Sequence, residues 1–179
     1  MTPDPFDILG LTPRWDVSVS DVERAYLRRV AAVHPDLATH DADADATSRL
    51  NLAKAELLNP QRRAEALLER LGGASAAQDK SLPKGFLPQV MALREEIEAS
   101  LAADADGLQR ERWRAAAALR YAAHLARLSE LFAAGTNDAL SAIRTELNAM
   151  RYTLRLIEQL DPGYRPGPEP SPPSGGNTG

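Results

Sequence analysis

A long stretch free of helix-breaking residues constrains this chain more than any other feature. No proline occurs between Pro88 and Pro162, and no glycine occurs between Gly107 and Gly135. Proline removes a backbone donor and glycine costs conformational entropy, so long helices require their absence. Good helix formers are abundant, whereas aromatic residues reach only 5%. We therefore expect an all-α protein.

Three amphipathic segments occupy the region 82–160. In segment 84–102 the apolar residues recur at alternating steps of four and three: Phe86, Val90, Leu93, Ile97 and Leu101. Segment 106–133 carries an alanine-rich strip that would let neighbouring helices approach closely: Leu108, Ala115, Leu119, Ala123 and Ala126. Segment 137–160 repeats at steps of three and four: Leu140, Ile143, Leu147, Met150, Leu154 and Ile157. Three such helices with short connections predict an antiparallel three-helix bundle.

The region 1–73 has the signals of a separate, smaller helical domain. Asp4-Pro5-Phe6 opens a short helical turn that Gly10 closes, and Ser20 with Glu23 fits a capping box that starts a helix reaching about Val33. The acidic stretch 40–45 predicts a loop. A second long helix follows it with Leu50, Ala53, Leu57 and Leu58 at helical spacing, and a further turn or two spans 62–71.

The composition of the remaining segments predicts the domain boundaries. The doubled glycine Gly72-Gly73 and the small polar residues after it predict a linker at 74–81 between a domain at 1–73 and the bundle at 82–160. The segment 161–179 is rich in Pro, Gly and Ser, cannot bury apolar surface, and predicts a disordered tail.

One polar tripeptide, His34-Pro35-Asp36, follows the first long helix. Proline cannot continue the helix, so it leaves the imidazole and the carboxylate on an exposed corner. With Arg24 and Arg28 on the preceding helix, the corner forms a mixed-charge docking surface rather than a catalytic one. Taken alone, the tripeptide could be only a helix stop.

The surrounding sequence resembles a J domain, through DPFDILGL, AYLRRVAAVHPD and LNLAKAELLNPQRRAEALL. The resemblance implies a helical hairpin flanked by two short helices. It also implies that His34, Pro35 and Asp36, supported by Arg24 and Arg28, engage the ATPase domain of a DnaK-type chaperone and trigger ATP hydrolysis.

The second region narrows this resemblance to the HscB-type co-chaperones of iron-sulfur cluster assembly, through NPQRRA, the leucine pair after it, and LPKGFLPQVMALREEIE. Leu87, Met91 and Glu95 recur every four residues off the core seam, and Tyr152 lies off the seam of the last segment. Exposed apolar residues rimmed by charge suit a partner site. The resemblance implies that these four residues bind the iron-sulfur scaffold protein. The alternative is that the apolar ones merely widen the core.

Composition and motifs argue against other functions. The net charge of −4 gives no general attraction to nucleic acid or anionic lipid, and the absence of cysteine rules out thiolate chemistry in this chain. No nucleophile, phosphate loop, metal-ligand spacing, secretory signal or membrane-length apolar run is recognisable, so we expect a cytoplasmic non-enzyme without cofactor, metal, nucleic-acid or membrane partner. Asp41, Asp43 and Asp45 lack the glycine and glutamate of a calcium loop, and His40 and His124 lack partners at zinc spacing.

The sequence thus predicts a co-chaperone that stimulates a DnaK-type ATPase and delivers the iron-sulfur scaffold to it. Two alternatives stay open. One is a J-domain co-chaperone for a different client, and the other is a helical interaction protein whose HPD tripeptide is vestigial.

Overall fold

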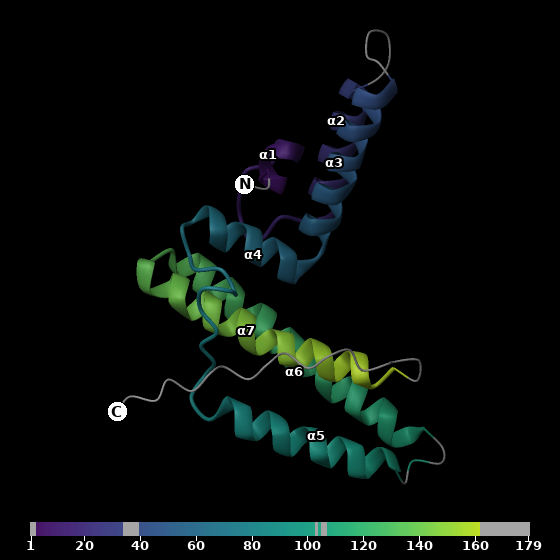
Figure 1. Cartoon of the computed structure of the whole chain (residues 1–179), viewed down its shortest axis with the longest axis vertical. Coiled ribbons are helices and arrows are strands. Elements are labelled where there is room, and N and C mark those ends of the chain that lie inside the picture. Colours follow the sequence, from purple (N-terminus) through teal and green to yellow (C-terminus); the bar gives the residue numbers. More distant parts are fainter. Residues whose placement is uncertain (1–2, 34–39, 103, 105–106, 162–179) are drawn as a thin grey trace. The chain divides into compact units, whose positions relative to one another are not determined.

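The protein is helical, and the computed structural model describes residues 3–33, 40–102, 104 and 107–161. In this described part seven helices and no strand are formed, which confirms the all-α prediction. In chain order they are α1 (Pro5–Leu9), α2 (Val19–Val33), α3 (His40–Leu58), α4 (Pro60–Arg70), α5 (Phe86–Ala102), α6 (Leu108–Ala134) and α7 (Asn137–Gln159), as labelled in Figure 1. None of these helices has both the length and the apolar character that crossing a bilayer requires.

The chain divides into two compact units. The first comprises Met1–Ser75 with Ser129–Ser141, and the second comprises Ala76–Leu128 with Ala142–Gly179. The segment 76–81, expected as part of a linker, is therefore grouped with the second unit by its contacts, whereas 74 and 75 are grouped with the first.

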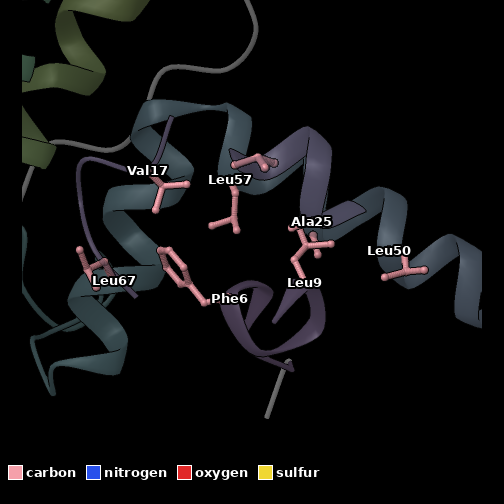
Figure 2. Close-up of a cluster of buried hydrophobic side chains, with 9 residues drawn as sticks. Phe6, Leu9, Val17, Ala25, Leu50, Leu57 and Leu67 are labelled. Atoms are coloured by element: carbon pink, nitrogen blue, oxygen red, sulfur yellow. The ribbon is translucent and has the colours of Figure 1, made fainter. Parts of the chain in front are cut away.

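The first unit is built around an α2–α3 hairpin with α1 packed against α3 and α4 following it. Figure 2 shows side chains from these helices and from the α1–α2 connection around one apolar core. Its buried members are Phe6, Leu9, Val17, Val22, Ala25, Leu50, Ala53, Leu57 and Leu67. The burial of Leu50, Ala53 and Leu57 confirms the helical spacing predicted for the second long helix of this region.

Helix α1 begins and ends where the sequence predicts. The Asp4 carboxylate accepts a hydrogen bond from the Phe6 amide at 2.8 Å, and Gly10 ends the helix with a φ of 67°. A methyl group added at Gly10 would also lie 2.6 Å from the Arg29 guanidinium, but that is the end of a flexible side chain, so it is the backbone conformation that requires glycine here. The same proximity shows that Arg29 of α2 is directed toward the end of α1.

The predicted capping box of α2 is displaced by two residues. Ser18 rather than Ser20 precedes the helix: its hydroxyl accepts from the Asp21 amide at 3.0 Å, while the Asp21 carboxylate accepts from the Ser18 hydroxyl at 2.7 Å. Ser18 and Asp21 thus form the reciprocal pair of a capping box. The prediction that Ser20 and Glu23 form this pair was wrong. Ser18 and Ser20 are each followed three residues later by a carboxylate, so the local sequence alone does not show which serine caps the helix. Starting the helix at Val19 adds two residues to it, and the Asp21 carboxylate in its first turn is stabilised by the positive end of the helix dipole.

The predicted acidic loop at 40–45 is also wrong, because α3 begins at His40 and includes the whole stretch. The alanines of this stretch explain the helix, because alanine has the highest helix propensity of all residues.

The second unit is formed largely by α5, α6 and α7, with α6 and α7 side by side in Figure 1. Residues from all three helices meet in one cluster of buried side chains: Ile97, Ala117, Leu156 and Leu160. The Trp113 indole of α6 donates to the Ser100 hydroxyl of α5 at 3.0 Å. The predicted seams of α5 and α7 are confirmed at their central positions, since Val90, Ile97, Ile143, Leu147 and Met150 are all buried.

The alanine-rich strip predicted for α6 faces the opposite way. Leu108 is 60% exposed, Leu119 is 73% exposed, and Ala115, Ala123 and Ala126 are exposed as well. The buried face of α6 instead carries Ala117, Leu128 and Leu131. Apolar residues occur on every side of this helix, so periodicity alone did not select the inward face. The observed face buries the Leu128 and Leu131 side chains and part of Trp113, which removes more apolar area from water than burying alanines would.

The capping arrangement generates the first testable prediction. Ser18→Ala should lower the free energy of unfolding by about 1 kcal/mol, because the Asp21 amide loses its side-chain acceptor. Ser20→Ala is the matched control and should change that free energy by less than about 0.5 kcal/mol. Urea unfolding followed by circular dichroism measures both free energies. A larger loss of stability for Ser20→Ala than for Ser18→Ala would show that Ser20, and not Ser18, caps the helix.

Candidate functional site

The tripeptide His34, Pro35 and Asp36 lies outside the described residues, so its arrangement stays a prediction. The helix that leads to it, α2, ends at Val33. Arg24 and Arg28 are exposed on α2, and their spacing of four residues places them on one face. Leu27, which is 63% exposed, lies between them in the sequence and on that same side of the helix.

An ion pair positions the first of these arginines. The Arg24 guanidinium donates to the Asp21 carboxylate at 2.6 Å, and Arg14 approaches the other oxygen of that carboxylate at 3.4 Å. The hydrogen bonds from the Ser18 hydroxyl and from Arg24 hold the pKa of Asp21 below its usual range. Asp21 is therefore charged at neutral pH and restrains Arg24. Sequence reasoning missed this role, although the three-residue spacing of Asp21 and Arg24 was a signal for it.

The second candidate surface lies on α5. Leu87 is half-buried, Met91 is 57% exposed and Glu95 is exposed, so the stripe every four residues lies outside the buried seam of this helix. This placement is the one expected from the sequence. It leaves a thioether and a carboxylate one turn apart on the surface of the second unit.

Tyr152 of α7 is half-buried, and its ring contacts the first residue of α5, Phe86. Its ring packs edge-on against Phe86, with centroids 5.7 Å apart and planes at 76°. The structure therefore brings Tyr152 next to the residue that precedes Leu87. Phe86 was predicted to lie on the core seam. It also packs against the Tyr152 ring, and the sequence did not indicate this contact.

A second contact from α7 fixes the segment that leads into α5. The Asn148 side-chain amide is buried and donates to the backbone carbonyls of Asp79 and Ser81, at 3.0 and 2.9 Å. Asn148 lies one turn before Tyr152 on the same helix. Two side chains of α7 thus hold the chain at 79–81 and at 86, and this sets where the α5 stripe begins.

The conformation of that segment is stabilised electrostatically. The Asp79 carboxylate accepts from the Ser81 amide at 2.8 Å. Hydrogen bonds from Ser81, with a smaller contribution from the positive charge of the fully buried Arg144, hold the pKa of Asp79 below its usual range. A charged Asp79 therefore lies beside a buried cation of α7, and both Asn148 and Arg144 were missed because their partners are distant in the sequence.

His124 has a structural arrangement rather than a metal-binding one. Its Nδ1 is 2.6 Å from the Glu146 carboxylate and its Nε2 is 2.8 Å from the Thr153 hydroxyl, which ties α6 to α7. Although carboxylate, imidazole and hydroxyl also form hydrolase triads, Thr153 is only 4% exposed and could not reach a substrate. Within the described ranges, no three His, Asp or Glu side chains gather as a metal site.

The hold of Asn148 on the segment before α5 gives the second testable prediction. Asn148→Ala should lower the free energy of unfolding by about 1–3 kcal/mol, because two backbone carbonyls lose a buried donor. Asn148→Asp has nearly the same shape but presents acceptors to acceptors, so it should destabilise further. Denaturant unfolding compares the three proteins, and an Asp variant as stable as wild type would show that donation to these carbonyls contributes little.

Comparison with known proteins bears on both units. Residues 82–161 match the family model described as the HscB C-terminal oligomerisation domain. A co-chaperone protein HscB homolog from Chromobacterium violaceum is 32% identical over 114 residues, which cover 59% of this chain and 64% of that protein. Its counterpart from Shewanella frigidimarina is 31% identical over 100 residues, covering 52% of this chain and 58% of that protein. The matched region thus spans about three fifths of each relative's length.

Solved structures show the same fold. The chaperone HscB from Vibrio cholerae superposes with a TM-score of 0.70 at 21% identity, covering 88% of this chain and 94% of that one. The human co-chaperone protein HscB superposes with a TM-score of 0.72 at 20% identity, covering 89% of this chain and 81% of that one. At these identities the likeness establishes the architecture, namely a J-domain-like unit and a three-helix bundle.

Proposed function

We propose that this chain is an HscB-type co-chaperone, which stimulates the ATPase of a DnaK-type chaperone and delivers an iron-sulfur scaffold protein to it. The match of residues 82–161 to the HscB C-terminal model and the similarity to two HscB homologs support the proposal. The observation that carries the proposal is the exposed stripe of Leu87, Met91 and Glu95 on that domain. A Met that is 57% exposed, one turn from a carboxylate, is suited to contact with another protein.

On the chaperone side, the proposed contact is made by His34, Pro35 and Asp36 together with the exposed face of α2. Arg24 and Arg28 supply positive charge, which attracts an acidic surface and speeds the encounter. The ion pair with Asp21 holds Arg24 in one orientation, so less side-chain freedom is lost when the partner binds. The chain supplies recognition here, and the hydrolytic chemistry belongs to the chaperone.

On the scaffold side, the proposed contact has an apolar centre and a charged edge. Leu87, Met91 and the Tyr152 ring would bury apolar area, while Glu95 would face a basic or amide group of the scaffold. The edge-on packing of Tyr152 on Phe86 restricts the ring before binding. Asn148, one turn before Tyr152 on α7, holds the segment that precedes α5, which also favours a preformed surface.

The two contacts gain from being made by one chain. A scaffold held by the second unit has a high effective concentration near a chaperone bound at the HPD tripeptide, so ATP hydrolysis and client capture can coincide. No new reacting group is needed for this coupling. A co-chaperone for a different client would use the same chaperone contact with another partner on α5.

The chaperone contact is tested by steady-state ATP hydrolysis of the cognate DnaK-type protein. The wild-type chain should raise the rate, and more so with scaffold protein present, whereas His34→Gln should return the rate to its basal value. The variant should still bind scaffold normally, which controls for its folding. Equal stimulation by wild type and His34→Gln would contradict this mechanism and favour a vestigial tripeptide.

The scaffold contact is tested by Met91→Glu, measured as scaffold affinity by calorimetry. A charge at the centre of an apolar contact should weaken binding at least tenfold, about 1.4 kcal/mol. Leu52→Glu is a matched control, because Leu52 is 63% exposed on α3 of the first unit and should leave the affinity unchanged. If the wild-type chain binds the chaperone but no scaffold, the bundle serves another client.

A further inference from the structure

A surface pocket of the first unit is not used by the proposed function. It lies among α1, the end of α3 and α4, and its volume of about 890 Å³ is in the range of pockets that hold ligands. Among the described residues that line it, none belongs to α2 or α5, which carry the proposed chaperone and scaffold contacts. A molecule bound in this α1–α4 pocket would therefore contact residues that neither proposed partner uses.

Core packing holds the two helical walls of the pocket in place. Phe6 of α1 and Leu67 of α4 belong to one buried cluster (Figure 2). Arg70 of α4 also joins the walls, because its guanidinium donates to the Asp4 carboxylate at 2.5 Å and to the Asp7 carboxylate at 2.9 Å. The pocket is thus formed before a ligand arrives, which lowers the entropic cost of binding.

Much of the pocket lining is apolar. Side chains from the start of the chain, from α4 and from the segment after α4 contribute to it: Pro3, Pro5, Ile8, Ala66 and Ala74. Pro5 is buried, and Ile8 and Ala66 are half-buried and pack against the core. Such a surface suits an apolar side chain of a ligand, because covering it removes apolar area from water.

The charged side chains that line the pocket are mostly acidic. Five of them are carboxylates: Asp4, Asp7, Glu56, Glu65 and Glu69. Arg62 and Arg70 offset two of these charges, which leaves a net formal charge of −3. Arg70 is already paired with two carboxylates of the α1 wall. Like charges gathered at one site repel each other and a concave surface concentrates their field, so the pocket attracts cations.

The occupants that this chain could itself supply do not complement this charge. The segment 162–179 has Arg165 and Glu169 as its only charged side chains, so it has no excess of positive charge. A second copy of the chain carries a net charge of −4. Charge complementarity therefore favours a basic partner over both.

We propose that the α1–α4 pocket binds a short basic segment of another protein, in which an apolar side chain lies between Lys or Arg residues. The apolar side chain covers Ile8 and Ala66, and the cations beside it pair with Glu56 of α3 and Glu69 of α4. This contact is a third one, beyond the two of the proposed function.

Fluorescence anisotropy of labelled peptides mixed with the full chain tests the proposal. A short peptide of alternating Lys and Leu should bind, and its affinity should fall as salt is added. Peptides in which Glu replaces Lys, or Ser replaces Leu, should each bind at least tenfold more weakly, and so should a peptide of the chain's own 162–179 sequence. Failure of the Lys-Leu peptide to bind, or equal binding by any of the other three, would overturn the proposal.

Charge reversal locates the binding site. The double variant Glu56→Lys, Glu69→Lys should weaken binding of the Lys-Leu peptide at least tenfold. Glu98→Lys, Glu158→Lys is the matched control, because it makes the same change in net charge at exposed positions of α5 and α7 and should bind as wild type. Circular dichroism checks that both variants fold. Equal weakening by both would show a general attraction to an acidic chain and would contradict a site in the pocket.

Backbone amide NMR of the wild-type chain gives the location without any substitution. Addition of the Lys-Leu peptide should shift the signals of Ile8, Ala66 and Ala74, and shifts confined to other surfaces would reject the pocket as the site. Neither chaperone nor scaffold is present in these measurements, so their outcome is independent of the proposed function.

Discussion

The second unit depends on satisfying polar groups along a helix that is buried on more than one side. In α7 four consecutive residues, 147–150, are all buried, so this helix has neighbours around much of its circumference. A buried polar side chain is costly unless it is paired. Asn148 meets this requirement through the carbonyls of Asp79 and Ser81, and Thr153 meets it through His124. The same bonds tie α6 and the segment before α5 to one helix.

This arrangement explains why the exposed stripe of α5 can act as a defined surface although its residues lie outside the core. The stripe begins directly after two fixed points, the 79–81 carbonyls and the Phe86 ring, both held by α7. Apolar seam residues such as Val90 and Ile97 then hold the helix against the bundle. Leu87 and Met91 are consequently positioned by neighbours that do not themselves need to contact a partner.

Fold and candidate site could be predicted where local spacing and burial agree. In α5 and α7 the large apolar residues lie on one side, so their spacing identified the inward face at Ile97 and Leu147 and marked Met91 as lying off it. In α6 the apolar residues do not lie on one side, because alanines and leucines occur all around the helix. Which face of α6 is buried therefore depends on how much apolar area each face can bury, and the spacing does not show this. The supports of the site, Asn148 and Arg144, could not be predicted, since their partners are distant in the sequence and a buried polar residue has no periodic signature.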